Sequence, residues 1–266
     1  MRPPPMPSTQ ASQPSSQRRT PAPDNPAEAE RTKRAWLKLA EQFAKGRRAS
    51  LEQLVRAASE GSRDEIDQAT STAALRRELV SKLEDVFRCE AVATRRPDRC
   101  GAAAPLGPKA EQGCRFDVAL VEDMFRAMFR AHDCRPEVVA KVAALLKAEQ
   151  AAVAALCTAA VDGNPAPCAQ VQGELKPVCE ATSRRDPAVC SRSLAPGSRA
   201  ASECESQARG ISALVTGQSS MITEDTRIAT LLRVVLGERP DCGADFARRL
   251  KASKAFSAPS GNAPTR

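Results

Sequence analysis

The sequence contains no tyrosine, one histidine (His132) and one tryptophan (Trp36) among its 266 residues. Chemistry that depends on imidazole or phenol groups therefore has few side chains to use, because His132 is the only imidazole that could activate a nucleophile. With the nearby Cys134, His132 could form a Cys–His dyad. Its position also suits a histidine at the end of a helix, where a cation complements the helix dipole. We expect the structural role.

Sequence motifs of common enzyme classes are also absent. There is no G-x-x-x-x-G-K, no G-x-G-x-x-G and no H-E-x-x-H. The acidic pairs Glu122–Asp123 and Glu224–Asp225 fall on expected helix surfaces or helix starts, and nothing in the sequence brings them together as a glycosidase requires. We expect no catalytic residues, no cofactor, no metal and no enzymatic activity. A hydrolase with an unrecognised site remains a further hypothesis.

Long hydrophobic runs are missing from the chain as well. No run approaches the ~18 residues of a membrane-spanning helix, so we expect no transmembrane segment. The first residues contain neither the basic start nor the apolar stretch of a secretory signal. If the protein is exported, its signal segment is absent from this chain.

The charge is unbalanced towards cations, with 40 Lys and Arg against 32 Asp and Glu and a net charge of +8. Such an excess favours acidic partners such as nucleic acid, anionic lipid or an anionic polymer. A soluble protein with an arginine-rich surface has the same balance. Aromatic residues do not alternate with basic ones as in RNA-binding strands, so we do not expect a nucleic-acid partner.

The ten cysteines, none of them in the first 88 residues, reveal an internal repeat. The segments 89–100, 157–168 and 179–190 all read C-x-A-x5-P-x2-C. After thirteen further residues, the first and third segments are followed by Cys114 and Cys204, so the longer pattern occurs twice at an offset of ninety residues. An internal duplication is the natural explanation.

The proline in each motif predicts a bend between two helices. Proline fixes φ and lacks an N–H, so it suits the first turn of a helix and ends a preceding one. We expect second helices to begin at Pro97, Pro165 and Pro187, with both cysteines of each motif close to the bend. Cys134 and Cys242 mark two further bends of the same kind.

The cysteine spacing favours disulfides over metal ligation. Structural zinc sites use cysteines two to four residues apart, and neither such a pair nor a redox C-x-x-C occurs. Buried or redox-sensing free thiols are the alternative. Each bend could be closed on itself or joined to a neighbouring bend. The disulfide candidates are Cys89, Cys100, Cys114, Cys134, Cys157, Cys168, Cys179, Cys190, Cys204 and Cys242.

No segment alternates polar and apolar residues over the length of a strand, so the predicted fold class is all-α: an irregular, repeat-like array of helical hairpins with cysteine-joined corners and disordered termini. Ser50 with Gln53, and Ser62 with Glu65, form candidate capping boxes. The expected regions are a Pro/Ser-rich disordered linker (1–26), a helical region without cysteine (27–88), a cysteine-rich helical repeat domain (89–255) and a disordered tail (256–266). Expected helices cover residues 26–44, 50–59, 62–95, 114–131, 136–157, 168–179, 200–215, 226–236 and 241–255.

Two apolar stripes are candidates for a partner surface. One contains Trp36 in a basic helix, and the other contains Phe125, Met128 and Phe129. Methionine-rich surfaces adapt to partners, and a basic helix with tryptophan suits an anionic membrane surface. The same spacing also fits packing in the protein core, which we expect.

These observations predict an exported or periplasmic, non-enzymatic binding or scaffold protein of a bacterial envelope. Its surface would face another protein or an anionic envelope polymer. The alternative is a cytoplasmic, basic helical protein that binds nucleic acid and keeps its thiols reduced. Disulfides are typical of oxidising compartments, so the state of the sulfur atoms distinguishes the two hypotheses.

Overall fold

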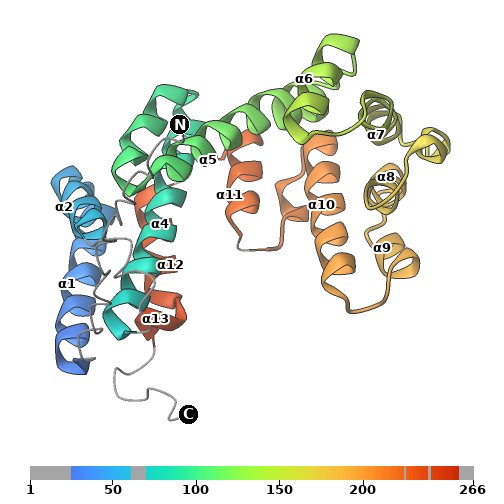
Figure 1. Ribbon diagram of the computed structural model, residues 1–266. Coiled ribbons are helices and arrows are strands. Elements are labelled where there is room, and N and C mark those ends of the chain that lie inside the picture. Colours follow the sequence, from blue (N-terminus) through green and yellow to red (C-terminus); the bar gives the residue numbers. More distant parts are fainter. Residues whose placement is uncertain (1–24, 61–69, 225, 239–240, 258–266) are drawn as a thin grey trace, which may run out of the picture.

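The computed structural model describes residues 25–60, 70–224, 226–238 and 241–257, and within these ranges it contains helices and turns but no strand (Figure 1). The predicted all-α array of helices with cysteine-joined corners is confirmed. The predicted disordered linker and tail fall largely outside the described residues. The capping box of Ser62 and Glu65 lies outside them entirely.

The two ends of the described chain pack together into one block. The C-terminal helices return to the N-terminal ones, so that α12 packs on both α1 and α4. The predicted regional boundary at residue 89 falls within α4, and helices from both sides of it share this core. The block consists of α1 (Pro26–Ala44), α2 (Arg48–Ser59), α4 (Ser71–Thr94), α12 (Cys242–Ala252) and α13 (Lys254–Ser257).

Aromatic side chains join α1 to the C-terminal helices. The ring centroids of Trp36 and Phe256 lie 6.4 Å apart, and those of Phe43 and Phe246 lie 6.0 Å apart. The sequence places Phe256 at the start of a disordered tail, and this is wrong. Phe256 is buried in α13, because Trp36 offers it an apolar face.

A second block is a succession of short helices. Figure 1 shows an arch in which α5 and η2 form one long helix connecting the two blocks, with α11 between them. Within the second block, α8 packs on α7 and on α10. The remaining elements are η1 (Pro97–Leu106), α5 (Pro108–Ala119), η2 (Leu120–Arg130, π-helical), α6 (Pro136–Leu146), α7 (Gln150–Asp162), η3 (Ala166–Gln170), α8 (Leu175–Arg184), α9 (Ala188–Ser193), α10 (Arg199–Thr216), η4 (Ser219–Met221) and α11 (Arg227–Val235).

Three local predictions are corrected by the structure. The helix expected over residues 136–157 is in fact two helices, α6 and α7. Lys147 ends α6 in a left-handed conformation (φ 53°), and the chain bends by 118° between the two helices. Residues 168–179 are not one helix either, and Pro177 lies in the first turn of α8, where a missing N–H breaks no helical bond. Ser50 does not cap α2, since its hydroxyl donates a hydrogen bond to Gln42 Oε1 at 3.2 Å.

The first and third cysteine motifs have the same corner geometry, as the ninety-residue offset predicts. Arg95 and Arg185 end α4 and α8 with the same left-handed conformation (φ 53°). The next residues, Arg96 and Asp186, donate their N–H groups to the carbonyls of Ala91 and Ala181 at 2.9 and 3.0 Å. The duplication therefore extends from the sequence to the backbone of the bend.

All ten cysteines lie in pairs at disulfide distance, and none is free. No motif is closed on itself, because the second cysteine of each motif bonds to the next cysteine along the chain. Cys134–Cys157 and Cys168–Cys179 join neighbouring bends, which is one of the two arrangements that the spacing allows, whereas Cys89–Cys242 joins two bends that are 153 residues apart. The pairs are Cys89–Cys242, Cys100–Cys114, Cys134–Cys157, Cys168–Cys179 and Cys190–Cys204.

Candidate functional site: a charged groove between α4, α11 and α12

The described part of the molecule has a groove of about 610 Å³ between α4, the start of α11 and the α12–α13 segment. This volume falls in the range of about 300–1,000 Å³ that is common for ligand sites. Five of its side chains are cationic and two are carboxylates. The lining residues are Glu78, Lys82, Asp85, Thr226, Arg227, Arg248, Arg249, Ala252, Ser253 and Lys254.

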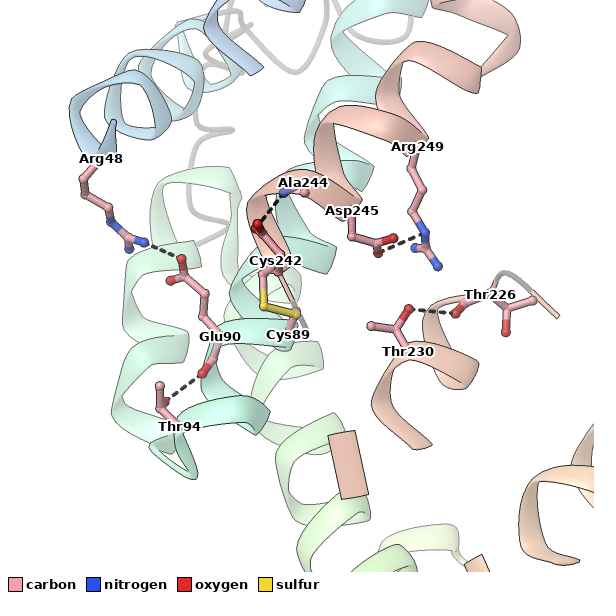
Figure 2. The surroundings of a disulfide bond; sticks show 11 residues. Arg48, Cys89, Glu90, Thr94, Thr226, Thr230, Cys242, Ala244, Asp245 and Arg249 are labelled. Carbon is pink, nitrogen blue, oxygen red and sulfur yellow. Dashed lines mark hydrogen bonds and ion pairs between the residues drawn. A yellow bond between two sulfur atoms is a disulfide. The ribbon is translucent and has the colours of Figure 1, made fainter. Parts of the chain in front are cut away.

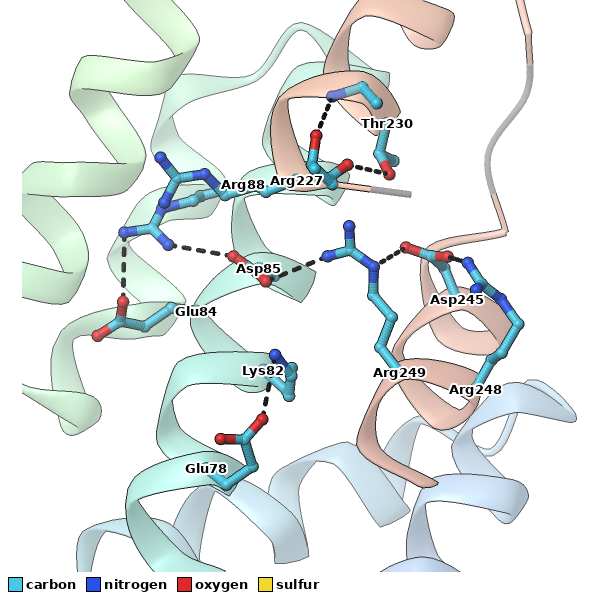
Figure 3. A network of polar contacts seen from close by, with 12 residues as sticks. Glu78, Lys82, Glu84, Asp85, Arg88, Arg227, Thr230, Asp245, Arg248 and Arg249 are labelled. Carbon is cyan, nitrogen blue, oxygen red and sulfur yellow. Dashed lines mark hydrogen bonds and ion pairs between the residues drawn. The ribbon is translucent and has the colours of Figure 1, made fainter. Parts of the chain in front are cut away.

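One wall of the groove continues into a buried network around Arg88 of α4 (Figure 3). The Arg88 guanidinium lies 3.2 Å from Glu84, 3.3 Å from Asp85 and 3.0 Å from Asp117, although only 8% of the residue is exposed. Gly113 of α5 makes room for it, because a Cβ atom there would lie 2.8 Å from Arg88 Nη2. A buried cation surrounded by carboxylates holds α4 and α5 together only while all members are present.

Asp117 is the most deeply buried carboxylate of this network, with 3% exposure. Burial raises the pKa of Asp117 above its ordinary value, because the charged form loses its hydration. Arg227, at 3.8 Å, and Arg88 oppose this shift through their positive charge. Arg227 therefore contacts the buried network and also lines the groove.

The opposite wall is formed by α12, where Asp245 pairs with both Arg248 and Arg249. Arg249 also reaches across to α4, with its Nη1 atom 3.3 Å from Asp85 Oδ2. Figure 3 shows Arg249 between the two carboxylates. This bridge fixes the distance between α4 and α12 and thereby the width of the groove.

The disulfide Cys89–Cys242 lines a small hollow of about 20 Å³, which shares Lys82, Arg227 and Arg249 with the groove. Figure 2 shows the bond between α4 and the start of α12. Asp241 caps α12 here by accepting a hydrogen bond from the Ala244 N–H at 2.8 Å. On the other side, Glu90 forms an ion pair with Arg48 of α2. The disulfide thus anchors the wall that carries Arg248 and Arg249.

The candidate partner-surface residues do not form an exposed surface, which corrects that hypothesis. Trp36, Phe125, Met128 and Phe129 are each at most 7% exposed. Their spacing reflects core packing, the interpretation that we expect from the sequence. Among the described residues, Phe116 is the large hydrophobic side chain that is exposed, at 42%.

His132 has a backbone contact rather than a nucleophile as its partner. Its Nε2 atom lies 3.1 Å from the Val215 carbonyl oxygen of α10, and its φ is 57° at the end of η2. The neighbouring Cys134 is bonded to Cys157. The Cys–His dyad is therefore wrong, and His132 connects two helix ends.

Sequence patterns did not indicate the groove. Its cations come from α4 and, more than a hundred residues later in the sequence, from α11, α12 and α13. Each lies on an ordinary helix surface. Two weak signals were present. Arg248–Arg249 is a basic doublet. Cys242 is the last cysteine of the chain, so a disulfide at this position would join the segment that became α12 to an earlier part of the sequence.

Metal ligands and membrane spans are the other features that could indicate a function. Within the described ranges, no group of three or more His, Cys, Asp or Glu residues has the arrangement of a metal site. No single helix there is long and apolar enough to cross a membrane, whereas the bent pair α6 and α7 meets the length and composition criteria together. No family model, curated protein or solved structure matches the chain.

Proposed function

We propose that this chain is an exported, disulfide-stabilised binding or scaffold protein of a bacterial envelope, without enzymatic activity. It would present its helical surface to another protein or to an anionic envelope polymer. The observation that carries this proposal is the pairing of all ten cysteines. Persistent disulfides are typical of oxidising compartments, because cytosolic reductants keep thiols reduced.

The distribution of the bonds supports a scaffold role. Four disulfides each join cysteines only 11 to 23 residues apart and fix successive corners of the array. Arrays of short helices present extended surfaces to other molecules. A rigid surface of this kind loses little conformational entropy on binding, which favours affinity.

The charge supports an acidic partner. The chain carries a net charge of +8, and the groove between α4, α11 and α12 is lined by five cations and two carboxylates. A positive surface attracts anionic molecules and accelerates their association.

Thiol trapping in the producing cells tests this proposal. Cells are quenched in acid, accessible thiols are alkylated before and after reduction, and the masses of the protein are compared. We expect no alkylated cysteine before reduction, all ten after it, and recovery of the protein outside the cytoplasm. The proposal would be contradicted if most of the ten cysteines were alkylated before reduction and the protein were recovered in the cytoplasmic fraction. That result would support the nucleic-acid hypothesis, for which steep salt dependence of binding to arbitrary DNA is the next test.

A further inference from the structure

We propose that the charged groove binds an acidic segment of a protein partner, in which several Asp or Glu side chains lie close together. This inference rests on the proposed binding function and names the site and the chemistry of the partner. The groove residues that would contact the segment are Arg227, Arg248 and Lys254.

The exposure of these three cations supports a ligand site. Arg227 and Arg248 have 40% and 55% of their side chains exposed, although each is near a carboxylate of the protein itself. Lys254 is exposed, and no ion pair is found for it among the described residues. A guanidinium group has five donors, so it can bind an incoming anion beside a carboxylate of the protein itself. All three can therefore donate hydrogen bonds to an incoming anion.

The start of α11 adds a second anion-binding feature to the same groove. Thr226 caps this nine-residue helix by accepting a hydrogen bond from the Ala229 N–H at 3.2 Å, and both Thr226 and Arg227 line the groove. The positive end of the helix dipole favours negative charge there. The Ser253 hydroxyl, for which no hydrogen-bond partner is found in the described structure, lies in the same lining.

The shape of the groove favours an extended chain. Arg248 also lines a neighbouring hollow of about 330 Å³ along α11 and α12, so the concave surface continues beyond the main groove. Glu238, Asp241 and Asp245 line that second hollow, so the acidic side chains of the segment would bind in the main groove and not there. The lining of the main groove contains no aromatic residue among the described side chains, and nucleic-acid bases would lack a stacking platform there. Carboxylates on a peptide match the spaced guanidinium groups, since arginine binds carboxylates through paired hydrogen bonds.

The test uses fluorescently labelled hexaglutamate and the full, oxidised protein in a titration at low salt. The groove variant is Arg248→Ala combined with Lys254→Ala. The matched control is Arg199→Ala with Lys176→Ala, which also removes one exposed Arg and one exposed Lys, but from α10 and α8. We expect the groove variant to bind about tenfold more weakly and the control to change affinity by less than about twofold.

Charge reversal and competition complete the design. Lys254→Glu lies on the surface, and we expect it to weaken binding while the far-ultraviolet circular dichroism stays unchanged. Unlabelled hexaglutamate should displace the probe, whereas inorganic phosphate, anionic lipid vesicles and DNA should not do so at equal charge.

Equal losses in the groove and control variants would overturn the inference, because they would indicate attraction by net charge alone. Displacement by vesicles or DNA at equal charge would overturn it as well. In either case, fully paired cysteines in the thiol-trapping experiment would leave the proposed function intact. The two failures are therefore distinguishable.

Discussion

Cys89 in α4 and Cys242 at the start of α12 are bonded through their sulfur atoms, although 153 residues separate them in the sequence. This bond lies within the first block, where it fixes the C-terminal helix α12 against α4. The other four disulfides each join cysteines no more than 23 residues apart. The long-range bond therefore restricts the unfolded chain more than any of the local ones.

Replacing both Cys89 and Cys242 by alanine should lower the free energy of unfolding by about 4 to 5 kcal/mol. The stabilisation by a disulfide grows with the length of the loop it closes, and the four inner bonds shorten this loop only in part. Denaturant titration of the oxidised variants, followed by circular dichroism, measures the change.

The matched control replaces Cys168 and Cys179, which are only 11 residues apart. For this pair we expect a smaller loss of about 3 kcal/mol. If the local pair costs as much as the long-range pair, or more, loop closure does not determine the stability of this fold.

The bends could be predicted from the sequence because proline and cysteine have strong local requirements. Pro97 and Pro187 each lie where one helix ends and the next begins, and the local preference of proline for the first turn of a helix gave these corner positions of the repeat. The pairing of Cys89 with Cys242 has no such local signal, since it depends on the return of α12 to α4. The same is true of the bend at Lys147, where a left-handed residue other than glycine ends a helix.

The groove could not be predicted for a related reason. Lys82, Arg227 and Arg248 come together only after α11 and α12 have packed against the distant helix α4, and arginines on helix surfaces are common. Buried charges are harder still to predict. Nothing in the sequence around Arg88 or Asp117 distinguishes them from exposed members of an amphipathic helix, and only the tertiary structure covers them.

Arg88→Met should lower the free energy of unfolding by about 3–5 kcal/mol. The change leaves the buried Asp117 without its nearest cation and also removes a cationic partner from Glu84 and Asp85, and such uncompensated charges are costly. As the control, Arg115→Met removes an arginine of α5 with 53% of its side chain exposed, and we expect a change within about 0.5 kcal/mol. Thermal and denaturant unfolding test both. A loss in Arg88→Met no larger than that of the control would rule out a structural role for the network.

The stability contributed by Asp117 should fall as the pH rises, whereas most acidic residues contribute more stability at higher pH. Because burial raises its pKa in the folded state, the folded protein binds this proton more tightly than the unfolded chain. The contribution of Asp117 is therefore complete below the ordinary pKa that an aspartate has in the unfolded chain. It is lost as the pH rises through the higher pKa of the folded state. Relative to Asp117→Asn, the unmodified protein should gain stability as the pH falls from 7 towards 4. A difference that stays constant across this range would contradict the raised pKa.

Phe256→Ala should lower the free energy of unfolding by about 3 kcal/mol, as expected for a core phenylalanine. The residue lies near the end of the described chain, yet its ring packs on Trp36 and it is only 3% exposed. Phe116→Ala is the matched control, because Phe116 is 42% exposed and its removal leaves no comparable cavity. We expect the control to cost less than about 1 kcal/mol.

The fluorescence of Trp36, the single tryptophan, should also change in Phe256→Ala and stay the same in the control. Equal costs and unchanged fluorescence in both variants would show that α13 does not pack against α1, and the C-terminal segment would then belong to the tail.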